Sequence, residues 1–251
     1  MSGQIVIVTG ASRGIGAATA RLLGAEKAAV VVNYRNAQAE ADAVVRDIEA
    51  AGGRAFAIQG DMGNEADILR VFAETDRAFG SLTGLVNNAG IAGGQKRRID
   101  AITFAGVMEV MRVNFAGPLL CAREAVKRMS RRNGGKGGAI VNVSSLGALT
   151  GSPGAFIDYA ASKGALDTMT IGLAAETAAN SIRVNAVRPG LIDTDIHQGL
   201  GIPDRVQRFG PMMPVGRAGT PQEVAEAIVW LLSDKASYVT GDFINITGGA
   251  R

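Results

Sequence analysis

A tyrosine and a lysine four positions apart give this sequence its clearest chemical signature. Tyr159 and Lys163 are separated only by the small residues Ala160-Ala161-Ser162. In a helix, positions i and i+4 share one face and lie roughly 6 Å apart along the axis. A free tyrosine titrates near about pH 10, so proton exchange at neutral pH needs a nearby positive charge that stabilises the phenolate. We therefore predict that Lys163 lowers the pKa of Tyr159, although an ordinary amphipathic helix could carry the same spacing.

Length and charge are typical of one enzyme-sized domain. The chain has 251 residues, is 47% hydrophobic and only 5% aromatic, and contains 34 glycines, which favours close packing of helices on a sheet. Its net charge of +3 is small. The basic clusters Lys127 to Arg132 and Lys96 to Arg98 are too few to indicate nucleic-acid binding. We expect one domain over residues 1–251 and no nucleic-acid partner.

The single cysteine and the apolar pattern indicate a cytoplasmic protein. Cys121 is the only cysteine, so an intrachain disulfide and a multi-cysteine metal site are both excluded. We expect Cys121 to be a small buried side chain in a helix. Met1 leads almost directly into the short apolar run Ile5 to Val8, and we recognise neither a signal peptide nor a membrane span. No cluster of histidine, cysteine and carboxylate side chains suggests a metal.

Short β-branched runs alternate with longer helical patterns along the whole chain. This alternation predicts parallel strands joined by crossover helices, and hence an α/β Rossmann fold with a doubly wound sheet and helices on both faces. We expect every strand to be buried on both faces. The seven predicted strands are Ile5-Val8, Ala29-Asn33, Ala55-Gln59, Gly84-Asn87, Ala139-Val143, Arg183-Val187 and Phe243-Ile246. The predicted helices lie near residues 14–25, 37–52, 64–79, 101–131, 156–179 and 221–234.

The first strand runs into a glycine-rich turn that could hold a pyrophosphate. The turn reads Thr9-Gly10-Ala11-Ser12-Arg13-Gly14-Ile15-Gly16. Glycine at 10, 14 and 16 allows a sharp turn and close approach of an anion to the free N–H groups at the start of a helix. The spacing differs from the GxGxxG fingerprint, but its place after the first strand favours a dinucleotide.

The end of the second strand suggests which dinucleotide is bound. An NAD-selective site usually offers an acidic residue to the ribose there, whereas this chain has Asn33-Tyr34-Arg35. Arg35 and Arg13 would instead suit a 2′-phosphate, so we predict NADP(H) in preference to NAD(H). The alternative is that both are surface arginines in unrelated ion pairs.

The third strand is followed by a second candidate contact. Asp61 could accept a hydrogen bond from the adenine amino group, with Met62 packed on the ring. Asp61 could equally be a turn or capping residue.

Together these motifs resemble the short-chain dehydrogenase/reductase family, in the branch of the 3-oxoacyl-carrier-protein reductases and glucose dehydrogenases. The resemblance extends from Ile5 to Gly249. It depends on motifs that occur in the family's order, namely residues 9–16, Asn87-Asn88-Ala89-Gly90, Asn114, Val143-Ser144-Ser145, Tyr159 with Lys163, and Arg188-Pro189-Gly190 followed by Thr194.

The resemblance assigns further residues to the site. Asn88, Ala89 and Gly90 would lie along the cofactor. Asn114 matches an asparagine in a locally distorted helix that holds a water linked to the catalytic lysine. The backbone of Pro189, Gly190 and Ile192 together with Thr194 would hold the nicotinamide carboxamide.

The catalytic serine follows the fifth strand. Family members place it second in a Ser-Ser pair, which selects Ser145 over Ser144. The interval from Ser145 to Tyr159 is one residue longer than in the commonest members, which would reshape the substrate pocket. Asp158, just before the tyrosine, could start a helix or meet a polar substrate.

These residues imply an oxidoreductase that acts on CH–OH donors with NAD(P) as acceptor. Tyr159 would exchange a proton with the substrate oxygen, Ser145 would hydrogen-bond that oxygen, Lys163 would hold the cofactor ribose, and Asn114 would relay protons. The alternatives are an NAD-dependent sugar or polyol dehydrogenase and a nucleotide sensor that has lost catalysis. The resemblance also implies a small-molecule carbonyl or alcohol substrate and a homotetramer, or a dimer, built on the long helices.

The segment 195–214 is long, irregular and rich in glycine and proline. Loops of this length in a compact domain are usually functional, so we predict a substrate lid. His197, the only histidine, lies in this segment and could contact substrate or solvent.

Overall fold

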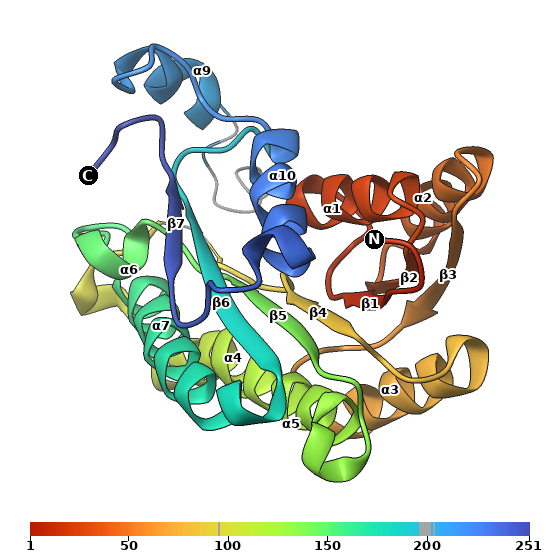
Figure 1. The fold of residues 1–251 in the computed structure, drawn as a ribbon. Coiled ribbons are helices and arrows are strands. Elements are labelled where there is room, and N and C mark those ends of the chain that lie inside the picture. Colours follow the sequence, from red (N-terminus) through yellow and green to blue (C-terminus); the bar gives the residue numbers. More distant parts are fainter. Residues whose placement is uncertain (95, 196–201, 203) are drawn as a thin grey trace.

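In the computed structural model, seven parallel strands form one sheet in the order β3-β2-β1-β4-β5-β6-β7 (Figure 1). The structure describes residues 1–94, 96–195, 202 and 204–251. The direction of winding reverses between β1 and β4, which creates a crevice at the carboxyl ends of the central strands. The strands are β1 (Ile5–Val8), β2 (Ala29–Tyr34), β3 (Arg54–Gln59), β4 (Gly84–Asn87), β5 (Gly138–Val143), β6 (Ile182–Pro189) and β7 (Phe243–Ile246).

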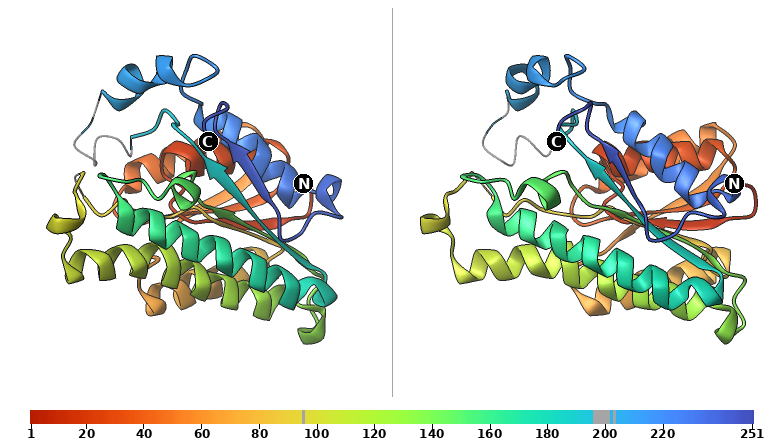
Figure 2. Two further views of the ribbon diagram at one scale, coloured as in Figure 1. Left: turned by 90° about the vertical axis from the view of Figure 1, so that its left-hand side faces the viewer. Right: turned by 60° about the vertical axis from the view of Figure 1, so that its left-hand side comes forward.

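Helices cover both faces of the sheet (Figure 2). One layer consists of α1 (Gly14–Ala25), α2 (Gln38–Ala50) and α10 (Pro221–Leu232). The other consists of α3 (Glu65–Phe79), α4 (Phe104–Met111), α5 (Gly117–Met129) and α7 (Ile157–Thr177). The predicted doubly wound α/β fold is therefore confirmed, and the predicted strands all occur with ends within two residues of those observed.

Burial differs between the centre and the edges of the sheet. All six residues of β2 are buried, as are the four of β4. The edge strands β3 and β7 are largely half-buried or exposed, so the prediction that every strand is buried on both faces is wrong for the edges. An edge strand has a neighbouring strand on only one side, which leaves its other side open.

Two apolar cores lie on opposite faces of the sheet. Valines of β1 and β2 pack with α1, α2 and α10 on one face, and Phe72 and Leu85 lie in the core formed with α3 and α5 on the other. Cys121 belongs to the second core, where its sulfur lies 3.8 Å from the sulfur of Met62. It is buried as predicted, and burial raises the pKa of its thiol to about 12.

The predicted helix 101–131 is divided in the structure. α4 ends at Met111, a π-helical segment spans Arg112–Ala116, and α5 begins at Gly117. Gly117 is required because a Cβ there would lie 2.0 Å from the backbone oxygen of Met62. By length and composition alone, the combined run Phe104–Met129 would suffice to span a membrane; here its helices pack against α3 and α7.

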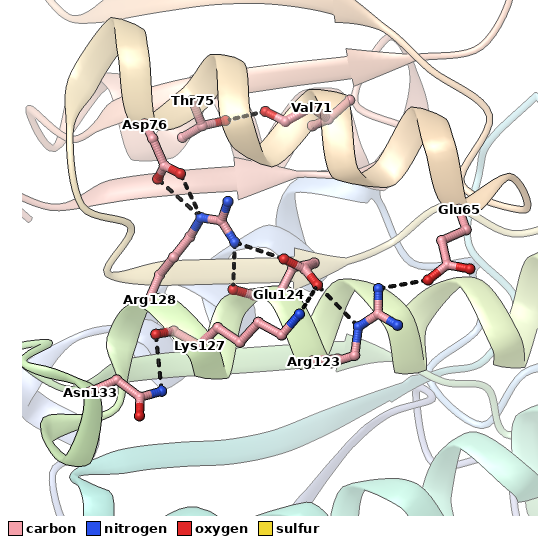
Figure 3. Close-up of polar contacts among 9 residues, drawn as sticks. All are labelled: Glu65, Val71, Thr75, Asp76, Arg123, Glu124, Lys127, Arg128 and Asn133. Carbon is pink, nitrogen blue, oxygen red and sulfur yellow. Dashed lines mark hydrogen bonds and ion pairs between the residues drawn. The ribbon is translucent and has the colours of Figure 1, made fainter.

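A buried carboxylate holds the arginines that join α5 to α3 (Figure 3). Glu124 is 4% exposed and accepts hydrogen bonds from Arg123, Lys127 and Arg128, at 3.0, 2.8 and 3.0 Å. Arg128 also pairs with Asp76 of α3 at 2.8 Å. Much of the basic cluster 127–132 is therefore occupied in holding the helical layer together.

Two short helices lie near the carboxyl edge. α6 (Gly147–Thr150) follows β5, and α9 (Arg205–Phe209) stands above the edge within the predicted lid segment (Figure 1). Each is shorter than two helical turns, so neither presents a repeating apolar pattern in the sequence. His197 lies outside the described residues.

Candidate functional site

A cavity of about 360 Å³ opens at the carboxyl ends of the strands. It is lined by residues from the turns after β1 to β6, which the parallel sheet brings to one edge. The predicted site residues in its lining are Gly10, Ser12, Arg13, Gly14, Ile15, Asn33, Arg35, Asp61, Met62, Asn88, Ala89, Gly90, Ser145, Tyr159, Lys163, Pro189, Gly190, Ile192 and Thr194. Gly16, Tyr34 and Asn114 are predicted site residues that do not line it.

The glycine-rich turn depends on close backbone contacts. Gly10 has a φ of +62°, and a Cβ on it would lie 2.9 Å from the Cα of Ala89. A Cβ on Gly16 would lie 2.5 Å from both the Gly10 carbonyl oxygen and the Asn88 amide nitrogen. Gly16 therefore does not face the cavity; its missing side chain allows α1 to pack closely against the glycine-rich turn. Asn88 donates to the carbonyl oxygens of Thr9 and Gly10, at 2.8 and 3.0 Å, which fixes the turn against β4.

Asn33 joins three strand ends at the floor of the cavity. Its side-chain oxygen accepts from the backbone N–H of Gly10 at 3.1 Å, and its nitrogen donates to the Gly60 carbonyl at 3.1 Å. The neighbouring Tyr34 points into the core formed with α1 and α2. Successive residues of a strand face opposite sides, so only one of this pair can face the core.

Two arginines reach the cavity from different turns. Arg13 and Arg35 both line it and are exposed. Among the described residues, neither side chain forms an ion pair or a side-chain hydrogen bond, in contrast to Arg21 of α1, which pairs with Asp47 at 2.8 Å. No carboxylate lies at the end of β2, where Asn36 and Ala37 complete the lining.

Asp61 is a turn residue that also lines the cavity. It lines the cavity, while one oxygen accepts from the Gly63 N–H at 2.8 Å and the other pairs with Arg112 at 3.2 Å. The turn and ion pair thus hold the carboxylate at the cavity wall. Met62 also lines the cavity but is only 4% exposed and packs mainly against α5.

Tyr159, Lys163 and Ser145 meet at the other end of the cavity. The first turns of α7 bring the Lys163 ammonium to 5.7 Å from the Tyr159 ring centroid, and this nitrogen donates to the Val143 carbonyl at 2.7 Å. Burial lowers the pKa of Lys163 to about 8, although the charge of Asp167 acts in the opposite direction.

The pKa of Tyr159 is raised in this structure, which differs from the predicted lowering. Burial is the main cause, and a hydrogen bond with Ser145 and the charge of Arg205 only partly offset it. Lys163 is not among the groups that offset burial, and its ammonium donates to the Val143 carbonyl.

The two serines after β5 face different partners. Ser145 hydrogen-bonds with Tyr159 and also accepts from the Gly147 N–H at 3.0 Å. Ser144 is buried and donates to the backbone carbonyl of Lys163 at 3.4 Å. Of the pair, Ser145 is the one directed at the phenol.

Asn114 lies in the π-helical segment, behind the cavity wall. Its oxygen accepts from the Ile91 N–H at 2.9 Å, and its nitrogen donates to the Ile91 carbonyl and to the Ser162 hydroxyl, at 2.8 and 3.0 Å. A Cβ on Gly90 would lie 3.4 Å from the Asn114 oxygen and 3.5 Å from the Lys163 nitrogen. The amide and the ammonium therefore flank the same glycine.

The segment after β6 closes the cavity from the far side. The methyl group of Thr194 would lie 3.4 Å from a Cβ on Gly14, so this segment approaches the glycine-rich turn. Gly190 is held to β7 by a backbone hydrogen bond to Ile246 at 2.9 Å.

Asp158 lies in the first turn of α7, but it neither caps the helix nor lines the cavity. Its buried carboxylate forms an ion pair with Arg97. Arg97 lies in the loop after β4. The backbone N–H of Arg97 also donates to the Ala155 carbonyl at 2.9 Å. The ion pair fixes this loop beside Tyr159.

Several lining residues were missed by the sequence interpretation: Asn36, Ala37, Gly60, Ile91, Val113, Val143, Ser144 and Asp195. Each lies within three residues of a predicted one, so extending every strand-end motif along the chain would have found them. Among the described residues, no group of three metal-ligating side chains occurs.

The lining of the cavity suits a dinucleotide in its chemistry. A Cβ at Gly10 would collide with Ala89, so only glycine leaves this approach to the helix N-terminus open. The unpaired arginines stand at one end and the phenol, ammonium and hydroxyl at the other. The fold and the site define a Rossmann-type oxidoreductase.

Comparison with known proteins identifies the family. Residues 10–251 match a family model described as enoyl-(acyl carrier protein) reductase. An uncharacterised oxidoreductase of Escherichia coli, YgfF, is 52% identical over 98% of this chain and 99% of its own length. A 3-oxoacyl-[acyl-carrier-protein] reductase of Synechocystis is 37% identical, over 99% and 97% of the two chains. A crystal structure of a dehydrogenase/reductase from Sinorhizobium meliloti superposes with a TM-score of 0.91 and 38% identity, covering 99% of this chain and 95% of that one.

The chain belongs to the short-chain dehydrogenase/reductase family and is an oxidoreductase of that family.

Proposed function

We propose that this protein transfers a hydride between NADP(H) and a small carbonyl compound or secondary alcohol, with Tyr159 as the proton donor and acceptor. One observation carries the proposal: the Tyr159 phenol, bonded to Ser145 and flanked by the Lys163 ammonium, faces a cavity that continues to the glycine-rich turn.

Different residues of the cavity would bind different parts of the cofactor. The N–H groups at the start of α1, beside Ser12 and Ile15, would bind the pyrophosphate. Asn88, Ala89 and Gly90 would lie along the cofactor, Lys163 would hold the ribose hydroxyls, and Thr194 with the backbone of Ile192 would hold the carboxamide. When bound, the nicotinamide supplies the hydride for reduction or accepts it for oxidation.

Preference for the phosphorylated cofactor is supported by Arg13 and Arg35. Both are exposed in the cavity without an acidic partner among the described residues, which is the state expected of groups reserved for a 2′-phosphate. A surface ion pair would have favoured the opposite interpretation.

The protein side of the reaction is a proton transfer. In reduction, the Tyr159 O–H bond breaks as its proton passes to the developing alkoxide, while Ser145 donates a hydrogen bond to the same oxygen. Lys163 and Asn114 would then return a proton from solvent to the phenolate. Oxidation runs these steps in reverse. The raised pKa of Tyr159 favours the protonated phenol, which is the form that reduction requires.

We also propose a homotetramer or dimer in the cytoplasm, with residues 195–214 as a substrate lid. Exposed apolar side chains on the long helices support the assembly: Phe104 is 82%, Met108 50% and Ile171 56% exposed.

The test is nicotinamide absorbance with NADPH and NADH in parallel, against ketones and 3-oxoacyl thioesters and, in reverse, alcohols and sugars. Tyr159→Phe should lower kcat by at least about 100-fold while NADPH affinity stays within a few fold, because the substitution removes only the exchangeable proton. Tyr238→Phe is the matched control, since Tyr238 is 101% exposed and away from the cavity. NADPH binding without turnover would favour a nucleotide sensor, and preference for NADH with sugars would favour the polyol dehydrogenase.

A further inference from the structure

A second cavity lies close to Tyr159. Its volume is about 260 Å³. Phe156 of its wall packs in one apolar cluster with Tyr159, and Leu191 lies between two residues of the catalytic cavity, Gly190 and Ile192. The wall includes Lys96, Phe156, Leu191, Arg205, Phe209 and Met213.

The wall of this cavity is mostly apolar, and the charged side chains that the structure describes there are all cations. Aromatic and aliphatic side chains form most of it, and its charged members are Lys96, which is exposed, and Arg205, which is half-buried. Among the described residues of the wall, there is no carboxylate. Such a surface favours a ligand with an apolar body and a negative charge.

Arg205 differs from the other partly buried arginines of the chain. Arg183 donates to the Leu231 carbonyl at 2.7 Å, and Arg188 pairs with Asp167 at 2.9 Å. The Arg205 guanidinium carbon instead stands 6.0 Å from the Phe156 ring centroid, and within the described chain it has no carboxylate or carbonyl partner. A desolvated cation without a hydrogen-bond acceptor costs free energy of folding, so the position of Arg205 is better explained by a function than by stability.

Arg205 also lies within electrostatic range of the reacting oxygen. Burial lowers the pKa of Arg205, and the charge of Tyr159 opposes this effect. A substrate whose reacting carbon meets Tyr159 can therefore place a second polar group near Arg205.

We propose that the second cavity selects ketones or secondary alcohols that carry a carboxylate, with Arg205 binding the carboxylate and the aromatic wall holding an apolar spacer. The planar guanidinium matches a carboxylate in a two-point hydrogen bond. This inference names the substrate class of the proposed function and rests on it.

The activity test compares 5-oxohexanoate with its methyl ester, which differ in charge but share the carbonyl and the spacer. The parent enzyme should prefer the acid in kcat/KM, chiefly through KM. Arg205→Gln should reduce kcat/KM for the acid by about 10- to 100-fold and leave the ester within a few fold, because only the acid loses a charge-assisted bond. Arg205→Lys should restore part of the preference.

Arg208→Gln is the matched control. Arg208 lies on the same short helix, is exposed, and stands 5.2 Å from the Phe209 ring centroid without lining the cavity. It should leave the preference for the acid unchanged.

A binding measurement separates this inference from the reaction itself. Calorimetric titration of the NADPH complex with hexanoate and with hexanamide requires no turnover. Tighter binding of hexanoate that disappears in Arg205→Gln supports the anion site even where no ketone reacts, in which case the proposed function alone fails. Equal binding of the two probes, or a preference that survives Arg205→Gln, overturns the inference.

The kinetic test has its own contrary result. Equal losses for acid and ester in Arg205→Gln, together with a shifted pH profile, would mean that Arg205 acts through Tyr159 rather than on the substrate.

Discussion

The guanidinium groups at positions 13 and 35 are the residues that most directly test the choice of cofactor. Arg35→Gln should raise the KM for NADPH by about 10- to 100-fold and leave the KM for NADH within a few fold, because only the 2′-phosphate loses its partner. Steady-state kinetics with the two cofactors measures the difference. Arg21→Gln is the control, since Arg21 pairs with Asp47 on the outer surface of α1 and α2. Equal changes with both cofactors would contradict a phosphate-binding role.

Residue types and spacing indicated the positions in the catalytic group but not its electrostatics. The four-residue interval placed Tyr159 and Lys163 on one face, as helix geometry requires. The sign of the Tyr159 shift was missed because it depends on burial, which is a property of the packed site. The choice of Ser145 over Ser144 came from the family resemblance, because residue types alone do not separate two adjacent serines.

At the scale of elements, a buried carboxylate of α5 holds the arginines that pair with α3. Glu124→Gln should lower the free energy of unfolding by about 1 to 3 kcal/mol near neutral pH, because three cationic donors lose a charged acceptor. Urea unfolding measures the loss. Glu74→Gln, on the exposed face of α3 with ion pairs of 3.8 and 4.0 Å, should change stability little.

The stability difference between the parent protein and Glu124→Gln should depend on pH. Burial alone would raise the pKa of Glu124, but hydrogen bonds from Lys127 and Arg128 outweigh it and lower the pKa below the usual 4.5. A carboxylate whose pKa is lower in the folded than in the unfolded protein contributes its full stabilisation at pH values above the unfolded-state pKa. That contribution is lost as the pH falls through the folded-state pKa. The difference between parent and Glu124→Gln should therefore shrink as the pH falls below about 4.5. A constant difference would mean that the charge is not responsible.

The positions of helices and strands were largely predictable, because the strands of a parallel sheet occur in the sequence as short β-branched runs separated by longer amphipathic patterns. The ends of β1, β4 and β7 agree with the prediction. The division of the predicted helix 101–131 was not evident from its apolar pattern, since a π-helical segment changes the hydrogen bonding without interrupting the run of helix-forming residues. The second cavity was also beyond prediction, because Phe156, Leu191 and Phe209 come from three segments that are far apart in the sequence.

At the scale of the whole molecule, the exposed apolar side chains on α4 and α7 are the feature that a single chain leaves unexplained. If these helices form the subunit interface, Ile171→Lys should shift the tetramer to dimers or monomers in sedimentation velocity, because a charge would be buried at the contact. Leu69→Lys, on α3 and 43% exposed, should leave the assembly unchanged. A monomeric parent protein would contradict the proposed assembly.

The buried thiol of Cys121 gives the protein a reporter of its own unfolding. Only the thiolate reacts with alkylating reagents, and a thiol with a pKa of about 12 in the core between the sheet and α5 is both protonated and shielded. In native protein the label should enter only during opening of the fold, so short pulses of iodoacetamide followed by mass measurement would time those openings without any engineered probe. Rapid labelling at neutral pH, before any loss of secondary structure, would contradict this expectation. Because the chain has one cysteine, each labelled molecule records a single opening of the helical layer that supports the active site.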